Sequence, residues 1–214
     1  KIMAFNGSPR RNGNTASLLK EAESAAASGA DTEYVDLYSL NYKGCISCFY
    51  CKRKDKEHGT CIVKDDLSPL LTKAKEADAL LFGSPIYFMG LTSGMHALLE
   101  RLFFSNYIYS QEIPSVLGKK MPSAFIYTMN VTEEQAKEAH LQQNVAAQEA
   151  FADRILGMPP KSLWLTTPCS SMITRNMNRR SSRKVIEGLP GKGRPICLKQ
   201  AYAIGQSLVQ DAGK

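Results

Sequence analysis

Asn6-Gly7-Ser8-Pro9-Arg10-Arg11-Asn12-Gly13-Asn14-Thr15 joins an apolar run, residues 2–5, to an Ala- and Leu-rich segment, residues 16–27. The run predicts a buried strand and the segment predicts a helix. The first N–H groups of a helix have no internal partner, and the helix dipole adds partial positive charge there. A glycine-containing turn at that point suits an anion, so we interpret this stretch as a phosphate-binding loop.

Side chains in this loop add further donors. Ser8, Asn14 and Thr15 supply hydroxyl and amide groups, and Arg10 supplies a permanently charged planar fork that matches phosphate. A nucleoside-triphosphate loop requires a Lys after its last Gly, but Asn14 follows Gly13 here. The turn also lacks the G-x-G-x-x-G pattern of a dinucleotide-binding loop. A single terminal phosphate fits this composition. The alternative is a surface turn with Arg10 in solvent.

Length and charge narrow the class of protein. The 214 residues predict one α/β domain over residues 1–214. No apolar run approaches the ~18 residues that span a membrane, and no signal peptide is visible, so we expect a cytoplasmic protein with no membrane partner. The net charge of the chain is +7, and most of this excess lies in residues 170–194, which contain seven basic residues and one acidic residue. This is a local patch without interleaved aromatic residues, so we expect no nucleic-acid partner.

Apolar runs and amphipathic segments alternate along the chain. This order predicts a parallel sheet with helices on both faces and ligands outside the carboxyl ends of the strands. We expect Asp66 to cap the helix ending near residue 76, and Thr132 with Gln135 to form a capping box for one long helix. The expected strands are 2–5, 32–37, 79–82, 124–127 and 162–165; the expected helices are 16–27, 66–76, 93–103, 132–156 and 196–209.

Two further loops are expected at the same edge of the sheet. Residues 83–90 contain four large apolar residues in succession, which are costly to expose unless something covers them. A flat ring attached to the phosphate would cover them, with Tyr87 or Phe88 stacking on it. The alternative is a loop buried in the core or in a dimer interface. Residues 128–130 form the third loop.

Several motifs together resemble the NAD(P)H-dependent FMN reductase family, which has the flavodoxin-like fold and includes the iron–sulfur flavoproteins. The resemblance is close over about residues 1–104. It implies a three-layer, doubly wound, five-stranded parallel sheet with strand order 2-1-3-4-5. The motifs are Gly7-Ser8-Pro9-Arg10, Gly13-Asn14-Thr15, Cys45-x-x-Cys48, Asp65-Asp66, Gly83-Ser84-Pro85-Ile86-Tyr87-Phe88 and Glu100-Arg101.

The resemblance also implies a cofactor, FMN, and the residues that bind it. Members of the family are commonly dimers or tetramers, so we expect a homodimer or homotetramer. The residues expected at the FMN phosphate are Ser8, Arg10, Gly13, Asn14 and Thr15. The residues expected around the isoalloxazine are Ser84, Pro85, Ile86, Tyr87, Phe88 and Gly90, with Thr128 and Asn130 from the third loop.

The activity implied is an oxidoreductase reaction. NAD(P)H would reduce FMN, and a small acceptor such as a quinone, a nitro or azo compound, a flavin or a metal chelate would then take the electrons. The chemistry belongs mainly to the cofactor, so we predict no catalytic side chain.

The sequence Cys45-Ile-Ser-Cys48-Phe-Tyr-Cys51 has the C-x2-C-x2-C spacing that holds one face of a 4Fe-4S cluster. Cys61 is the candidate fourth ligand, although its gap from Cys51 is longer than is usual in iron–sulfur flavoproteins. A cluster would make the protein an electron carrier; free thiols, a zinc site and a redox disulfide are the alternatives. Four neighbouring bases are expected to favour thiolates: Lys52, Arg53, Lys54 and Lys56.

Overall fold

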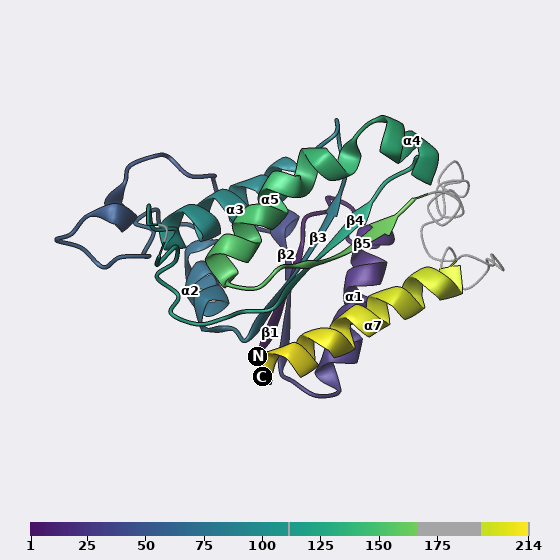
Figure 1. The fold of residues 1–214 in the computed structure, drawn as a ribbon, viewed down its shortest axis with the longest axis horizontal. Coiled ribbons are helices and arrows are strands. Elements are labelled where there is room, and N and C mark those ends of the chain that lie inside the picture. The colour runs from purple at the N-terminus through teal and green to yellow at the C-terminus, as the bar shows by residue number, and fades with distance from the viewer. Residues whose placement is uncertain (111, 167–193, 214) are drawn as a thin grey trace.

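The structure is a computed structural model that describes residues 1–110, 112–166 and 194–213. Of the basic patch noted in the sequence, residues 170–194, all but Arg194 lie outside this described part. Within it, a single sheet with helices on both faces positions every loop that the sequence singled out (Figure 1).

The sheet has five parallel strands in the order β2-β1-β3-β4-β5, which confirms the predicted topology and the flavodoxin-like fold. Its three central strands are fully buried; the continuous apolar runs at residues 2–5 and 79–82 predicted this for β1 and β3. Stacked rings continue across these strands, from Phe5 to Phe82 and from Phe82 to Phe125. The strands are β1 (Ile2–Asn6), β2 (Thr32–Asp36), β3 (Ala79–Pro85), β4 (Ser123–Thr128) and β5 (Lys161–Leu165).

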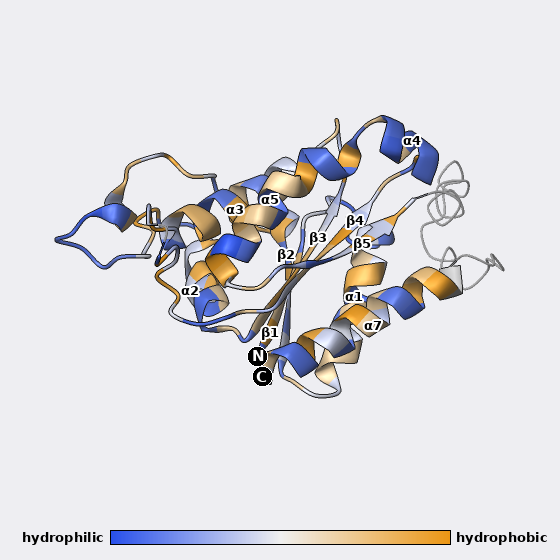
Figure 2. Ribbon diagram, in the orientation of Figure 1, coloured by the Kyte–Doolittle hydropathy of each residue, from blue (hydrophilic) through white to orange (hydrophobic). Residues whose placement is uncertain are grey.

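Helices cover both faces of the sheet and bury two apolar clusters (Figures 1 and 2). None of the described helices is both long enough and apolar enough to cross a membrane. On one face lie α1 (Asn14–Ala27) and α7 (Arg194–Ala212), and on the other lie α2 (Ser68–Glu76), α3 (Ser93–Asn106) and α5 (Leu141–Leu156). Three short helices complete the described elements: α4 (Glu133–Glu138), η1 (Leu37–Ser39) and η2 (Tyr50–Lys52).

The expected helix 132–156 is two helices. The capping box of Thr132 and Gln135 forms as predicted, but the helix that it starts ends at Glu138. His140 then adopts a left-handed conformation, with φ 52°, and α5 begins at Leu141. This change of direction allows Ala136 on α4 and Leu141 on α5 to reach the same apolar cluster. Helical periodicity was correct on both sides of a break that it could not reveal.

The predicted cap of α2 is also wrong. Asp65, and not Asp66, accepts a hydrogen bond from the N–H of Leu67, at 3.1 Å, just before the helix begins at Ser68. The carboxylate of Asp66 instead accepts from the N–H of Asn41, at 2.7 Å. In the second loop, β3 continues through Pro85, which pairs with Thr128, so Ser84 and Pro85 are buried strand residues. The loop itself starts at Ile86.

The crossing of α1 and α7 requires a glycine. A Cβ atom on Gly205 would lie 1.9 Å from the carbonyl oxygen of Ala22, which is main chain and cannot rotate away. The two helix backbones therefore approach each other closely at this point, and the apolar face of α7 packs against α1 and the sheet.

We predict that Gly205→Ala lowers the free energy of unfolding by roughly 3 kcal/mol, because α7 must move away from α1. Urea denaturation measures this loss. Gly213→Ala is the control, because a Cβ there would make only ordinary contacts, the shortest 3.7 Å from the carbonyl oxygen of Val209. Equal stability of the wild type and the Gly205→Ala protein would contradict the helix arrangement.

Candidate functional site

The three predicted loops meet at the carboxyl edge of the sheet, and direct hydrogen bonds join them. Gly7 donates its N–H to the carbonyl oxygen of Gly83 at 2.7 Å, which links the first loop to the end of β3, where the second loop begins. Ile86 donates its N–H to the carbonyl oxygen of Thr128 at 2.9 Å. The hydroxyls of Thr15 and Thr128 lie 2.7 Å apart and close the third side. The convergence expected from the strand order is therefore present.

Thr92, the N-cap of α3, joins the first loop to the end of β3 by hydrogen bonds. Its hydroxyl donates to the carbonyl oxygen of Gly7 at 2.7 Å and accepts from the N–H of Met95 at 3.3 Å. Its own N–H donates to the hydroxyl of Ser84 at 3.2 Å. Thr92 was not among the residues predicted from the sequence, although a Thr directly before the apolar periodicity of a helix is a capping signal.

The first loop presents main-chain donors at the start of α1. The N-cap is Gly13, no side chain caps the helix, and its first turn contains no acidic residue. The amide oxygen of Asn14 is buried and has no hydrogen-bond partner. Because the amide oxygen and nitrogen can exchange places by rotation, the same position can present two N–H donors to an anion. The site therefore fits a phosphate group.

The other predicted residues of this loop shape its backbone. The hydroxyl of Ser8 is buried and accepts from the N–H of Arg10 at 3.2 Å, and Gly13 donates its N–H to the carbonyl oxygen of Arg10 at 3.1 Å. Since the hydroxyls of Thr15 and Thr128 form one pair, one of them donates to the other, and the second retains a free O–H.

Gly7 and Gly83 allow this close approach of main chains. A Cβ on Gly83 would lie 3.0 Å from the Cγ2 atom of Thr15, and one on Gly7 would lie 3.0 Å from Met95. Larger residues would push α1 and α3 away from the strand ends, which would open the crevice.

The second loop ends in a tight, strained turn. Tyr87 and Gly90 exchange two backbone hydrogen bonds of 2.9 and 3.0 Å around Phe88 and Met89, which have φ angles of 46° and 68°. Side chains other than glycine cost about 1–2 kcal/mol each in this left-handed region. The turn exposes Tyr87, Met89 and all of Phe88, whereas Ile86 is partly buried against the core. Exposed apolar groups on a strained turn are typical of a ligand contact.

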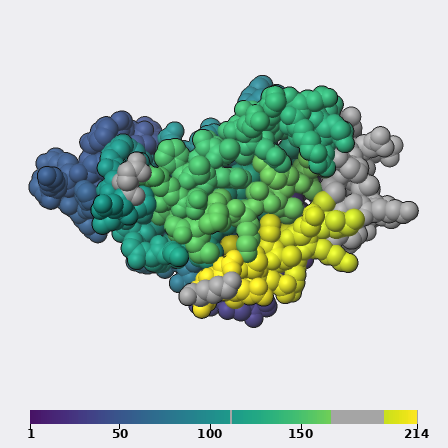
Figure 3. Space-filling model, in the orientation of Figure 1, coloured from purple at the N-terminus to yellow at the C-terminus, as the bar shows by residue number. Residues whose placement is uncertain are grey.

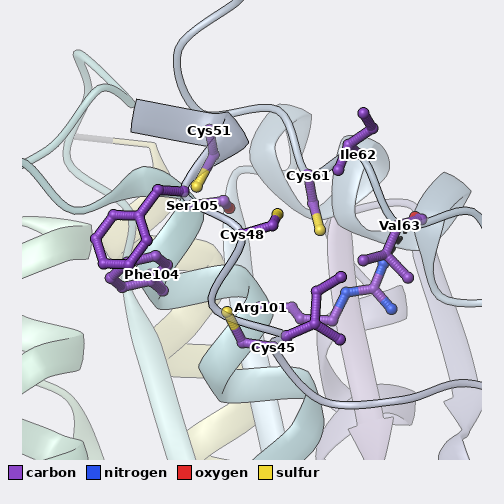
Figure 4. A pocket seen from close by; sticks show the side chains of 11 residues that line it. Cys45, Cys48, Cys51, Cys61, Ile62, Val63, Arg101, Phe104 and Ser105 are labelled. Atoms are coloured by element: carbon purple, nitrogen blue, oxygen red, sulfur yellow. Dashed lines mark hydrogen bonds between the residues drawn. The ribbon is translucent and has the colours of Figure 1, made fainter. Parts of the chain in front are cut away.

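The loop between η1 and α2 carries four cysteines around one small pocket. Figure 4 shows Cys45, Cys48, Cys51 and Cys61 arranged around it. The segment between Cys51 and Cys61 folds back on itself: Gly59 donates its N–H to the carbonyl oxygen of Cys51 at 3.3 Å, and the chain then returns to Cys61. In Figures 1 and 3 this loop projects from one end of the molecule, beyond α3. The long gap before Cys61 is thus accommodated.

The cysteine loop is held to α3 by a buried arginine. The guanidinium of Arg101 pairs with the carboxylate of Asp65 at 2.6 Å, and its side chain is completely inaccessible to solvent. It also donates to the carbonyl oxygen of Lys43 at 3.2 Å and of Val63 at 3.1 Å. These two carbonyls precede Cys45 and follow Cys61 along the chain. One side chain therefore fixes both arms of the loop.

The Cys51 thiol is not shifted toward the thiolate, contrary to our expectation from the neighbouring basic residues. Burial raises the pKa of the Cys51 thiol, and the charge of Lys52 offsets this only in part. The ammonium of Lys52 donates to the carbonyl oxygens of Phe104 and Tyr107 at the end of α3. The carboxylate of Asp55 binds the side chain of Arg53, at 2.8 Å, and lies 3.7 Å from the ammonium of Lys56.

The Asp65–Arg101 pair gives a testable pH dependence. Burial by itself would raise the pKa of Asp65, but hydrogen bonds from Arg101 and from the N–H groups of Lys43 and Leu67 lower it below its ordinary value of 3.8. A depressed folded pKa contributes stability above the unfolded pKa and loses it as the pH falls through the folded pKa.

We predict that Asp65→Asn lowers the free energy of unfolding at pH 7 by roughly 2 kcal/mol, because a charged partner of buried Arg101 is lost. The difference from wild type should shrink as the pH falls below 3.8, since Asn does not titrate. Urea denaturation at several pH values measures both. The exposed neighbour provides the control: Asp66→Asn should change stability much less. A pH-independent difference for Asp65→Asn would contradict this account.

Fold and site together define a class: a flavodoxin-like α/β protein in which the loop before the first helix presents main-chain donors that fit a phosphate group. The family model described as NADPH-dependent FMN reductase matches residues 1–152. The chain belongs to this family, as its motifs suggested.

Similar sequences include several iron–sulfur flavoproteins. One from Methanocaldococcus jannaschii is 40% identical over 102 residues, covering 47% of this chain and 51% of the relative. One from Archaeoglobus fulgidus is 31% identical over 128 residues, covering 59% of this chain and 54% of the relative. The chain spans about half the length of these curated relatives.

Solved structures share the fold over nearly the whole chain. An NAD(P)H:quinone oxidoreductase from Methanothermobacter marburgensis has a TM-score of 0.65 at 16% identity, covering 97% of this chain and 98% of that one. An azoreductase from Bacillus anthracis has a TM-score of 0.64 at 14% identity, covering 96% and 98%. A flavodoxin from the domain Archaea has a TM-score of 0.51 at 13% identity, covering 100% and 99%.

Proposed function

We propose that this protein binds FMN and passes electrons from NAD(P)H through it to a small acceptor. The observation that carries the proposal is the uncapped start of α1 at Gly13, with the buried, unpartnered amide oxygen of Asn14 beside it. Membership of the FMN reductase family supports the same cofactor. Quinones and azo compounds are the acceptor classes that the names of the structural neighbours suggest.

The protein's own groups would bind and orient the cofactor. The amides at the start of α1, with Arg10, would hold the phosphate, and the turn at Tyr87–Gly90 would cover the ring. When bound, FMN supplies the chemistry of hydride and electron transfer. The hydroxyl of Ser84 does not donate to the ring in this arrangement, because it donates to the carbonyl oxygen of Pro85 at 2.9 Å; it also accepts from the N–H of Thr92. Ser84 would therefore act by holding the loop.

The test compares FMN with riboflavin, which lacks the phosphate. We predict that Arg10→Gln weakens FMN binding about tenfold, the usual cost of one charge-assisted hydrogen bond, and leaves riboflavin binding unchanged. Fluorescence titration of the metal-free protein measures both dissociation constants. Arg11→Gln is the matched control, since both arginines are exposed.

In the wild type, FMN should bind more tightly than riboflavin, and the bound protein should oxidise NAD(P)H in the presence of a quinone. Equal affinities for FMN and riboflavin would contradict the phosphate site. Tight FMN binding without NAD(P)H oxidation would contradict the reductase activity only.

A second candidate function, an electron-carrying iron–sulfur flavoprotein, is favoured by the four-cysteine pocket. Similarity to proteins named iron–sulfur flavoproteins supports it. Cys45, Cys48, Cys51 and Cys61 would hold the 4Fe-4S cluster, whose chemistry is one-electron transfer. The pocket wall is largely apolar, with Ile46, Ile62 and Phe104 among its residues, which suits a group shielded from water.

The spacing of these cysteines favours a cluster over a single ion. Among the described residues, no three His, Cys, Asp or Glu side chains are arranged to hold one metal ion. Zinc requires four sulfurs at about 2.3 Å from one centre. A cubane binds one thiolate at each of four irons, so its ligands lie further apart around a larger group. Four cysteines line one pocket, which is the number of thiolate ligands that a cubane requires.

We predict that protein prepared without oxygen contains about four irons and four sulfides per chain, as a cubane requires. Iron and sulfide assays with a visible absorption spectrum measure this. Cys61→Ser should lose most of the iron and keep FMN, since the two sites lie on different loops. A wild type that binds FMN but contains no iron would contradict the iron–sulfur function and would leave the proposed FMN reductase function unaffected.

Oligomerisation is proposed as well. The turn at Tyr87–Gly90 exposes three large apolar side chains, and a largely apolar groove lies between α3 and α5. Exposed apolar surface of this kind is covered in homodimers or homotetramers. Light scattering of the FMN-loaded protein tests this proposal, and a monomer at micromolar concentration would contradict it.

A further inference from the structure

The buried guanidinium of Arg101 has one donor that the described structure leaves unused. Its two terminal nitrogens bind the carboxylate of Asp65 and the carbonyl oxygens of Lys43 and Val63. Its Nε atom is buried and has no hydrogen-bond partner. An unsatisfied buried donor costs about 1–3 kcal/mol, and more when it is charged, so such a group calls for an explanation.

The unused donor belongs to a residue that lines the four-cysteine pocket. Arg101 forms part of its wall together with Cys45 and Cys61. In Figure 4 the sulfur of Cys61 points toward the Arg101 side chain. The bonds of the two terminal nitrogens fix the plane of the guanidinium, and they therefore also fix the direction of the Nε–H. A sulfur that moved inward on binding a cluster would approach this donor.

We propose that the Nε–H of Arg101 donates a hydrogen bond to a sulfur of the metal site, through the ligand Cys61, and thereby raises the reduction potential of the cluster. This inference rests on the second candidate function. Hydrogen bonds to ligand sulfurs stabilise the more negative, reduced state. Arg101 is thus a positioning residue with two roles: its terminal nitrogens fix the loop, and its Nε sets the potential.

The test compares two variants that weaken the same ion pair, between Arg101 and Asp65. Arg101→Lys keeps the charge and can still reach Asp65, but it has no Nε–H. Asp65→Asn removes the negative partner of Arg101 and keeps the Nε–H. Both variants should lower thermal stability. Only a sulfur-directed donor makes the potential fall in Arg101→Lys, which keeps the positive charge, so the sign of that change separates this role from a purely structural one.

At the midpoint potential of the wild-type cluster, we expect the ratio of reduced to oxidised cluster to fall about tenfold in Arg101→Lys, the usual worth of one charge-assisted hydrogen bond. In Asp65→Asn the ratio should not fall, because a negative charge has been removed near the site. Spectroelectrochemical titration of the iron-loaded proteins measures both ratios. Iron-loaded Arg101→Lys protein with an unchanged ratio overturns this inference alone, whereas an iron-free wild type overturns it together with the second candidate function.

If Arg101→Lys protein retains no iron, the wild type still gives an answer. Protein labelled with ¹⁵N is loaded with ¹¹³Cd, a diamagnetic metal that thiolates bind. A hydrogen bond to a ligand sulfur should shift the Nε–H resonance of Arg101 and couple its proton to the metal. Assignment uses the resonance that Arg101→Lys lacks. An unshifted, uncoupled Nε–H, or a wild type in which the four cysteines bind no cadmium, overturns the proposal.

Discussion

The buried ion pair between Arg101 and Asp65 is the constraint on which the cysteine loop depends. A guanidinium with no solvent access needs an opposite charge beside it, and here the partners of its two terminal nitrogens come from both arms of the loop. The loop exposes the apolar side chains of Ile46, Phe49 and Ile62. The buried Arg101 of α3 therefore holds the loop in the conformation that forms the four-cysteine pocket.

The same helix organises the other site. Thr92, at the start of α3, binds the main chain of the phosphate loop and the hydroxyl of Ser84. Glu100 and Arg101 lie about 14 Å further along the helix axis, given 1.5 Å per residue, and hold the cysteine loop. A single rigid element thus fixes the distance between the crevice and the four cysteines. In the second candidate function, that distance would govern electron transfer between the two groups.

The crevice is built mainly from backbone groups and from hydroxyls that bind one another. Ser8, Ser84, Thr92 and Thr128 are buried, and their hydrogen bonds within the protein define the positions of the loops. In the proposed function, such a site would bind and orient the cofactor. Its apolar part, the turn at Tyr87–Gly90, is strained and exposed, so it has the features of a surface that a flat ring or a second subunit covers.

The amino-acid sequence by itself determined the fold class, the strand order through family resemblance, and the loops that meet at the sheet edge. Those features follow from hydrophobic periodicity and from glycine-containing turns, which are local in the chain. The break at His140, the role of Asp65 in place of Asp66, and the continuation of β3 through Pro85 were decided only by the tertiary structure. Each depends on partners far along the chain. The pairing of Arg101 with Asp65, 36 positions apart, is the clearest case, because burial selects the partner of a charge and sequence spacing does not.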